Sequence, residues 1–157
     1  MLQVEHLTRR YGPVTAVDDL SFTISDVGVY GFLGPNGAGK STTMNIMTGC
    51  LSATGGTVKI SGYDIYDQPR EAKRRIGYLP EQPPLYLGET PEEYLRFVGE
   101  AKGLRGETLR QQMEAVIEET GIGEMRSRRI DALSKGYRQR VGIAQALLGQ
   151  PELVILD

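Results

Sequence analysis

Apolar and polar residues alternate in the first part of the chain, and this period of two predicts β-strands. Leu2, Val4 and His6 alternate with polar neighbours, and a second such run extends from Leu20 to Ile24. Runs of mainly apolar residues predict four further strands. Val27–Leu33 and Leu153–Leu156 are expected to be buried strands, and the other two are Val58–Ile60 and Ile76–Leu79. Turn residues separate several of these segments, at Tyr11-Gly12-Pro13 and at the glycines within 54–57 and 61–65. The chain is therefore expected to begin with strands that pair through short turns.

The spacing of apolar residues changes to a helical period in the middle of the chain. Thr90-Pro91-Glu92-Glu93 has the pattern of a helix capping box, and the helix from about Glu107 to Thr120 is expected to stop at Gly121. A short helix is predicted from Pro69 to Arg75, and a longer one after Ser134. Strands followed by helices predict an α/β fold with a mixed sheet, antiparallel N-terminal strands and an inserted helical subdomain. The expected division is a core at about 1–82, a helical subdomain at about 83–150 and a last strand at 151–157.

One glycine-rich segment carries the clearest chemical signal in the chain. It matches the phosphate-binding loop pattern G-x-x-x-x-G-K-[ST], lies after the predicted strand Val27–Leu33, and precedes a predicted helix from Thr42 to Met47. Backbone amides of such a loop, together with a helix N-terminus, attract phosphate oxygens; Lys40 would reach the β- and γ-phosphates and Ser41 would bind Mg²⁺. The segment consists of Gly34, Pro35, Asn36, Gly37, Ala38, Gly39, Lys40, Ser41 and Thr42. The sequence therefore predicts a protein that binds a nucleoside triphosphate.

Composition narrows the class of protein further. A length of 157 residues suits one domain, and a net charge of -2 does not favour direct binding of nucleic acid. The single cysteine excludes an internal disulfide, and the only histidine, His6, is interpreted as a strand-face residue. The N-terminus does not resemble a signal peptide, and no apolar run approaches the ~20 residues that span a bilayer. Any connection to a membrane is expected to come through a partner.

The last third of the chain contains two more candidate elements. Ser134 stands at the N-cap position of a helix with one apolar face, and the final strand delivers Asp157 at its carboxyl end. Ligands of open α/β sheets gather at that edge, so this carboxylate is expected to hold Mg²⁺ through its second shell.

The order of these motifs resembles the ATP-binding subunit of ABC transporters from Met1 to Asp157. Gly34–Thr42 is similar to the Walker A motif and Leu153–Asp157 to Walker B, while Leu133–Tyr137 resembles the Leu-Ser-Gly-Gly-Gln signature. Tyr11 falls where the family places an aromatic residue that stacks on adenine. The resemblance implies ATP and Mg²⁺ as cofactors and an ATPase activity for the intact protein.

The resemblance also implies partners and further site residues. Ser134, Lys135 and Gly136 would contact the ATP of a second subunit in a head-to-tail dimer, which is expected to be a homodimer. Lys135 and Tyr137 depart from the signature. Glu81 aligns with the glutamine of the family's Q-loop and Gln82 follows it; either could contact the metal and the attacking water. Permease subunits in the membrane would hold the protein at the inner face of the cell membrane, in the cytoplasm. The departures resemble bacterial exporter-like subunits of the multidrug, sodium-efflux and gliding-motility type.

The family's catalytic glutamate, D-loop and switch histidine follow Walker B, after Asp157. The sequence is therefore expected to be truncated, to lack the C-terminal part of the core, and to hydrolyse ATP poorly if at all. Three alternatives stay open: a soluble ABC-type ATPase that acts on ribosomes or DNA, a different P-loop enzyme such as a GTPase, and a non-catalytic nucleotide-binding fragment. A GTPase would need guanine-reading residues, and no Asn-Lys-x-Asp occurs.

Overall fold

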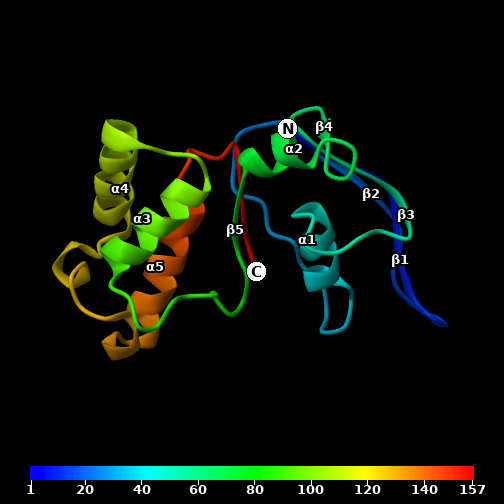
Figure 1. Cartoon of the computed structure of the whole chain (residues 1–157). Helices are drawn as coiled ribbons and strands as arrows, with labels where there is room; N and C mark the ends of the chain where they lie inside the picture. Colours follow the sequence, from blue (N-terminus) through cyan, green and yellow to red (C-terminus); the bar gives the residue numbers. More distant parts are fainter. The chain divides into compact units, whose positions relative to one another are not determined.

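The computed structural model describes residues 1–157 and has an α/β fold with antiparallel N-terminal strands, as predicted. The chain forms two compact units: an N-terminal unit of Met1–Ile76 with Asp157, and a helical unit of Gly77–Leu156. Figure 1 labels their helices and strands. No helix combines the length and the apolar character needed to cross a membrane.

The N-terminal unit is organised around a four-stranded sheet (Figure 1). Its strands are β1 (Leu2–Tyr11), β2 (Val14–Ile24), β3 (Gly55–Ile60) and β4 (Tyr63–Asp64), in the order β2-β1-β3-β4. Every pair is antiparallel, and Val4 of β1 lies between Phe22 of β2 and Val58 of β3. The predicted turn after Tyr11 and the predicted β3–β4 hairpin are confirmed. Because residues with period two share a face, Leu2, Val4, Val58 and Ile60 are buried together.

His6 lies on β1 as an exposed strand residue, but a β-bulge interrupts the predicted alternation at this position. The register of β1 against β2 shifts between Val4 and Leu7, and His6 has a positive φ of 51°. Its amide donates to Ser21 Oγ over 2.8 Å, and its exposed ring lies 2.7 Å (Nδ1 to Oδ1) from Asp19. The bulge turns His6 to solvent and brings Leu7 into the core, where it is completely buried.

Two helices complete the N-terminal unit: α1 (Lys40–Met47) and α2 (Pro69–Arg74). The prediction of a buried strand over Val27–Leu33 was wrong, because this segment belongs to neither sheet. Val27, Val29 and Leu33 are almost fully exposed, and only Phe32 packs, with its ring 5.9 Å from that of Phe22. A strand needs a neighbour for its backbone hydrogen bonds, and none lies beside this segment, so its apolar residues alone do not make it one.

The helical unit contains three helices, which Figure 1 shows as a group. They are α3 (Pro91–Ala101), α4 (Gly106–Thr120) and α5 (Lys135–Leu147), with short 3₁₀ turns η1 (Gly123–Met125) and η2 (Ile130–Ala132) before α5. The predicted capping box is present, since Thr90 Oγ1 accepts from the Glu93 amide and the Glu93 carboxylate accepts from the Thr90 amide. Gly121 ends α4 in the left-handed conformation, as predicted. The core between the helices includes Leu95, Met113, Ile117, Val141 and Leu148.

Strands β5 (Ile76–Leu79) and β6 (Leu153–Leu156) pair as a second, two-stranded sheet. The predicted mixed sheet is thus represented by two separate sheets. The expectation that β6 is fully buried is corrected: Ile155 is buried, but Val154 and Leu156 are 37% and 53% exposed. With β5 as its only neighbour, β6 has little to cover its outer face.

Candidate functional site

The candidate site begins at the glycine-rich loop, where the backbone turns from an extended segment into α1. Gly37 and Gly39 have φ angles of 82° and 81°, and the Ala38 amide donates to the Pro35 carbonyl over 3.2 Å. The first hydrogen bond of α1 runs from the Thr43 amide to the Gly39 carbonyl. The amides of Lys40, Ser41 and Thr42 therefore precede the helical hydrogen bonds and are free to meet an anion.

Gly39 is also required by the packing beneath the loop. A Cβ atom at this position would lie 2.3 Å from the Ala16 carbonyl oxygen and 3.1 Å from Val17 Cγ2, both on β2. The start of α1 thus rests directly on the backbone of β2, which fixes the loop against the sheet. Gly37 has open space around it, so only its positive φ favours glycine there.

The ammonium group of Lys40 folds back onto the first residues of the loop. Its Nζ donates to the carbonyl oxygens of Gly34 and Pro35 over 2.7 and 2.8 Å. The ammonium charge of Lys40 therefore lies in the same loop as the backbone amides that are free to meet an anion. Oxygens of a polyphosphate are stronger acceptors than these carbonyls, because the hydrogen bond would then join two charged groups.

Ser41 and Asp157 meet although 116 positions separate them in the sequence. The Ser41 hydroxyl donates to Asp157 Oδ1 over 3.0 Å, so the predicted carboxylate does reach the loop. A hydroxyl and a carboxylate are the hard oxygen donors that Mg²⁺ prefers. No group of three or more His, Cys, Asp or Glu side chains is placed to hold a metal. This donor set therefore fits a Mg²⁺ ion that takes its other ligands from phosphates and water, rather than an all-protein cage.

The signature-like segment lies at the start of α5. Ser134 is the N-cap of this helix, and its Oγ accepts from the Tyr137 amide over 3.3 Å. Ser134, Lys135 and Gly136 are all exposed. Tyr137 is half-buried against the helical core, with the Arg140 guanidinium carbon 5.4 Å from its ring centroid. The exposed end thus presents a hydroxyl, a helix N-terminus and a cation, a combination suited to an anion.

A sequence profile described as "ABC transporter" matches residues 17–157. The chain belongs to the ABC transporter family. It is 40% identical over its whole length to an uncharacterized ABC transporter ATP-binding protein, YxlF, and 36% identical to the linearmycin resistance ATP-binding protein LnrL, both of Bacillus subtilis strain 168. It covers 52% and 50% of these two proteins, so the chain spans about half the length of the curated relatives it matches.

Solved structures of ABC cassettes share the fold. The dimeric structure of MJ0796, a bacterial ABC transporter cassette, superposes with a TM-score of 0.88 at 25% identity. That comparison covers all of this chain and 73% of the MJ0796 chain. The α/β fold is therefore that of ABC ATP-binding domains.

The remaining ABC-type residues are exposed at the ends of their elements. Tyr11 stands at the end of β1 and is 46% exposed. Glu81 and Gln82 follow β5 and Pro80 in the helical unit and are also exposed. Within the N-terminal unit, the structure brings Ser41 together with Asp157. The other residues lie on accessible backbone turns or strand ends, where side chains are available to a ligand.

Sequence reasoning missed Arg9, which lies beside Tyr11. The Arg9 guanidinium carbon is 4.5 Å from the centroid of the Tyr11 ring. The signal was available, because residues two apart on a strand share a face and a cation next to an aromatic ring on one face can stack.

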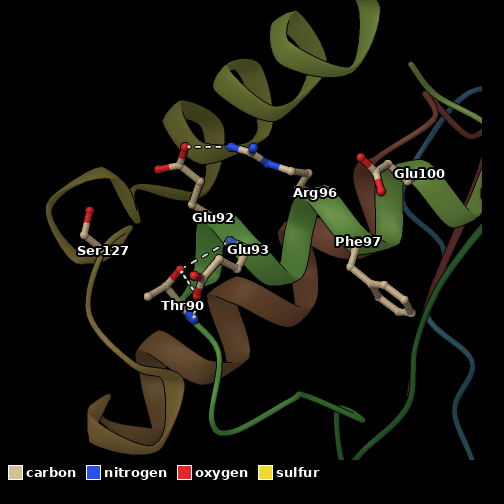
Figure 2. Close-up of a pocket in the computed structure, with 7 residues that line it drawn as sticks. All are labelled: Thr90, Glu92, Glu93, Arg96, Phe97, Glu100 and Ser127. Atoms are coloured by element: carbon tan, nitrogen blue, oxygen red, sulfur yellow. Dashed lines mark hydrogen bonds and ion pairs between the residues drawn. The ribbon is translucent and has the colours of Figure 1, made fainter. Parts of the chain in front are cut away.

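A pocket of about 570 Å³ lies along α3 and contains none of the predicted site residues. Figure 2 shows the side chains around it, which come from α3 and the segments beside it. Three of the seven residues that line the pocket are glutamates. The hydrogen bond from the Thr90 amide lowers the pKa of one of them, the Glu93 carboxyl. Arg96 partly balances them by pairing with Glu92 over 3.3 Å. The lining residues are Thr90, Glu92, Glu93, Arg96, Phe97, Glu100 and Ser127.

Proposed function

We propose that the chain is the nucleotide-binding part of a subunit that couples ATP binding and hydrolysis to transport across a membrane. The observation that carries this proposal is the placement of Lys40 in the loop and the hydrogen bond between Ser41 and Asp157. The loop supplies amides and an ammonium group for the phosphates, and the Ser41–Asp157 pair supplies oxygens for the metal. Both parts of a nucleotide site thus come together in one unit of the chain.

Each residue of the site has a distinct role in the proposal. Gly34–Thr42 binds the phosphates through backbone amides, and Lys40 neutralises charge on the β- and γ-phosphates. Ser41 holds Mg²⁺ directly, and Asp157 orients it through the Ser41 hydroxyl or a bound water. Mg²⁺, when bound, would neutralise phosphate charge and fix the geometry of the triphosphate. Tyr11 would stack on the adenine base.

The exposed start of α5 is proposed to contact the ATP of a second subunit. Ser134 and Gly136 would approach the γ-phosphate, and Lys135 would add positive charge. The name of the MJ0796 structure describes a dimer of that cassette, which supports a pair of subunits here, and we propose that the two are arranged head to tail. Glu81 and Gln82 would contact the metal and the attacking water at the turn after β5. By function, we divide the chain into a nucleotide-binding core at about 1–82, a helical subdomain at about 83–150, and a strand at 151–157 that delivers Asp157. The first boundary differs from that of the two compact units, because Glu81 and Gln82 belong to the helical unit by contacts and to the core by their proposed role.

Membrane-spanning partner subunits would complete the transporter and hold this protein at the inner face of the membrane. LnrL is named for resistance to linearmycin, which supports an exporter among the possible systems. The transport role is tested by reconstituting the intact subunit with its membrane partner in lipid vesicles. ATP-driven movement of a substrate would support it, whereas ATP hydrolysis that responds to ribosomes or DNA instead would favour a soluble ATPase.

The nucleotide role is tested by calorimetric titration of the intact protein with Mg-ATP and with Mg-GTP. Lys40→Ala is expected to weaken Mg-ATP binding about tenfold to a hundredfold, because a charge-assisted hydrogen bond to phosphate contributes about 1.5–3 kcal/mol. Lys59→Ala is the matched control, since Lys59 lies on β3 in no segment assigned to the nucleotide. Absence of any heat from Mg-ATP at millimolar concentration would refute the proposal.

A further inference from the structure

Arg9 is a cation placed against a ring that the proposed function assigns to a nucleotide base. It precedes Tyr11 by two positions on β1, so both side chains stand on one face of the strand. The guanidinium carbon is 4.5 Å from the centroid of the Tyr11 ring, which is a stacking distance. Arg9 is half-buried while Tyr11 is 46% exposed. The cation therefore lies on the inner side of a ring that still reaches solvent.

The Arg9 guanidinium also forms a hydrogen bond with the backbone of another segment. Its Nη1 donates to the Ser52 carbonyl over 2.9 Å, and its Nε is buried with no hydrogen-bond partner. A buried N–H without an acceptor is costly, and the electron-rich face of an aromatic ring offsets part of that cost. Arg9 and Tyr11 are thus paired with each other more strongly than a solvent-exposed cation and ring would be.

The backbone that anchors Arg9 is also fixed. Tyr66 forms hydrogen bonds on both sides of Ser52. Its hydroxyl donates to the Leu51 carbonyl over 2.8 Å and accepts from the Ala53 amide over 3.0 Å. The Thr54 amide then donates to the Thr8 carbonyl of β1 over 2.8 Å. This segment leads from the end of α1 to β3, so Arg9 links the end of β1 to the chain that leaves the phosphate-binding helix.

We propose that Arg9 is a positioning residue for the nucleotide base. It covers one face of the Tyr11 ring and restrains its orientation, and the base stacks on the opposite face. This inference rests on the proposed function, because it requires a nucleotide whose base meets Tyr11. The free protein then holds the ring in place before the nucleotide arrives, and less side-chain freedom is lost on binding. Any purine or pyrimidine has a face that can stack, so the effect favours a nucleotide over a bare polyphosphate without selecting the base.

The test compares Mg-ATP with magnesium tripolyphosphate, which carries the phosphates without a base. In calorimetric titrations of the intact protein, Arg9→Ala is expected to weaken Mg-ATP binding about three- to tenfold, the cost of ordering one side chain, and to leave tripolyphosphate binding unchanged. Arg10→Ala is the matched control, because Arg10 is the exposed neighbour on the strand and stacks on no ring. It should change neither affinity.

A double-mutant cycle separates positioning from a general effect on the fold. On a Tyr11→Ala background, Arg9→Ala should add no further loss of Mg-ATP affinity, because the ring through which it acts has been removed. Arg9→Lys, which keeps the charge but lacks the planar guanidinium, should give an intermediate loss and serves if Arg9→Ala does not fold. Since the chain has no tryptophan, Tyr11→Trp gives a single fluorescent reporter, whose anisotropy should fall when Arg9→Ala is added.

The outcomes distinguish this inference from the proposed function. Equal weakening of Mg-ATP and tripolyphosphate, or full additivity with Tyr11→Ala, would show that Arg9 supports the fold of the loop instead. Unchanged Mg-ATP affinity in both Arg9 variants would also overturn the positioning role. If the unmodified protein binds neither ligand, the proposed function itself fails.

Discussion

The two left-handed glycines of the phosphate-binding loop allow a comparison in which backbone strain is held constant. Gly37 and Gly39 have φ angles of 82° and 81°, so an alanine at either position meets nearly the same strain, about 1–2 kcal/mol. Alanine also restricts the unfolded chain, which offsets about 0.4–1 kcal/mol of that loss. Gly37→Ala meets no other atom within 4 Å. It should therefore lower the free energy of unfolding by about 1 kcal/mol.

Gly39→Ala adds a steric conflict to the same strain. Its Cβ would lie 2.3 Å from the Ala16 carbonyl oxygen, which is a backbone atom of β2 and not the end of a flexible side chain. Overpacking of this kind costs about 1–3 kcal/mol, so the total loss should be about 2–4 kcal/mol. Part of the conflict can be relieved by moving the start of α1, which would displace the amides of Lys40–Thr42.

Urea unfolding of both variants, followed by circular dichroism, measures the difference between the two substitutions. Gly39→Ala should have a clearly lower unfolding midpoint than Gly37→Ala, with a similar dependence on urea concentration. Calorimetric titration with Mg-ATP should also show a larger loss of affinity for Gly39→Ala. Equal destabilisation by the two substitutions would refute the contact between the start of α1 and β2.

Three further predictions concern a helix cap, the metal pair and Lys102, whose ammonium group donates to the carbonyl oxygens of Gln145 and Leu148. Thr90→Ala removes the capping box of α3 and should lower the free energy of unfolding by about 1 kcal/mol in urea titrations. Burial lowers the pKa of Lys102 to about 8 from 10.5, so the unfolded chain holds this proton to a higher pH. The free energy of unfolding should thus gain a contribution that rises between about pH 8 and 10.5, and Lys102→Met should remove that rise. Asp157→Asn should weaken Mg²⁺ binding in the ATP complex about tenfold to a hundredfold, measured by titrating Mg²⁺ at fixed ATP.

Matched substitutions keep these three predictions specific. Thr108→Ala, at an exposed position of α4, is the control for the cap, and equal losses would remove the cap from the explanation. A pH profile of Lys102→Met that runs parallel to that of the unmodified protein would show that Lys102 does not titrate in this range. Asp18→Asn changes an exposed carboxyl group on β2, and it should leave the Mg²⁺ titration unchanged.

Elements that depend on neighbouring residues were predictable from the sequence. The capping box at Thr90 and Glu93 and the stop of α4 at Gly121 are formed within a few positions of the chain, so their residue types suffice. The loop at Gly34–Thr42 belongs to the same class, because its shape comes from its own glycines. Where geometry is local, the residue pattern is sufficient to predict the element.

Features that depend on distant partners were predicted poorly. Val27–Leu33 has the composition of a strand, but strand formation requires a neighbour, and composition does not report whether one is present. The bulge at His6 arises from the pairing of β1 with β2, where Asp19 and Ser21 meet it across the ladder. The spacing of Arg9 from Tyr11 was visible in the sequence, and only its anchor at Ser52 depends on another segment.

The signature-like segment shows how an atypical residue can leave a proposed binding surface intact. At position 137 the helix cap uses the backbone amide, which donates to Ser134 Oγ whatever side chain the residue carries. The Tyr137 side chain points to the helical core, where its ring is half-buried and meets Arg140. Lys135 is the opposite case, because its side chain is exposed beside the cap and adds charge to the surface that a phosphate would approach. The two departures from the family's signature therefore act at different places: Tyr137 changes the packing of α5, and Lys135 changes the field at its N-terminus.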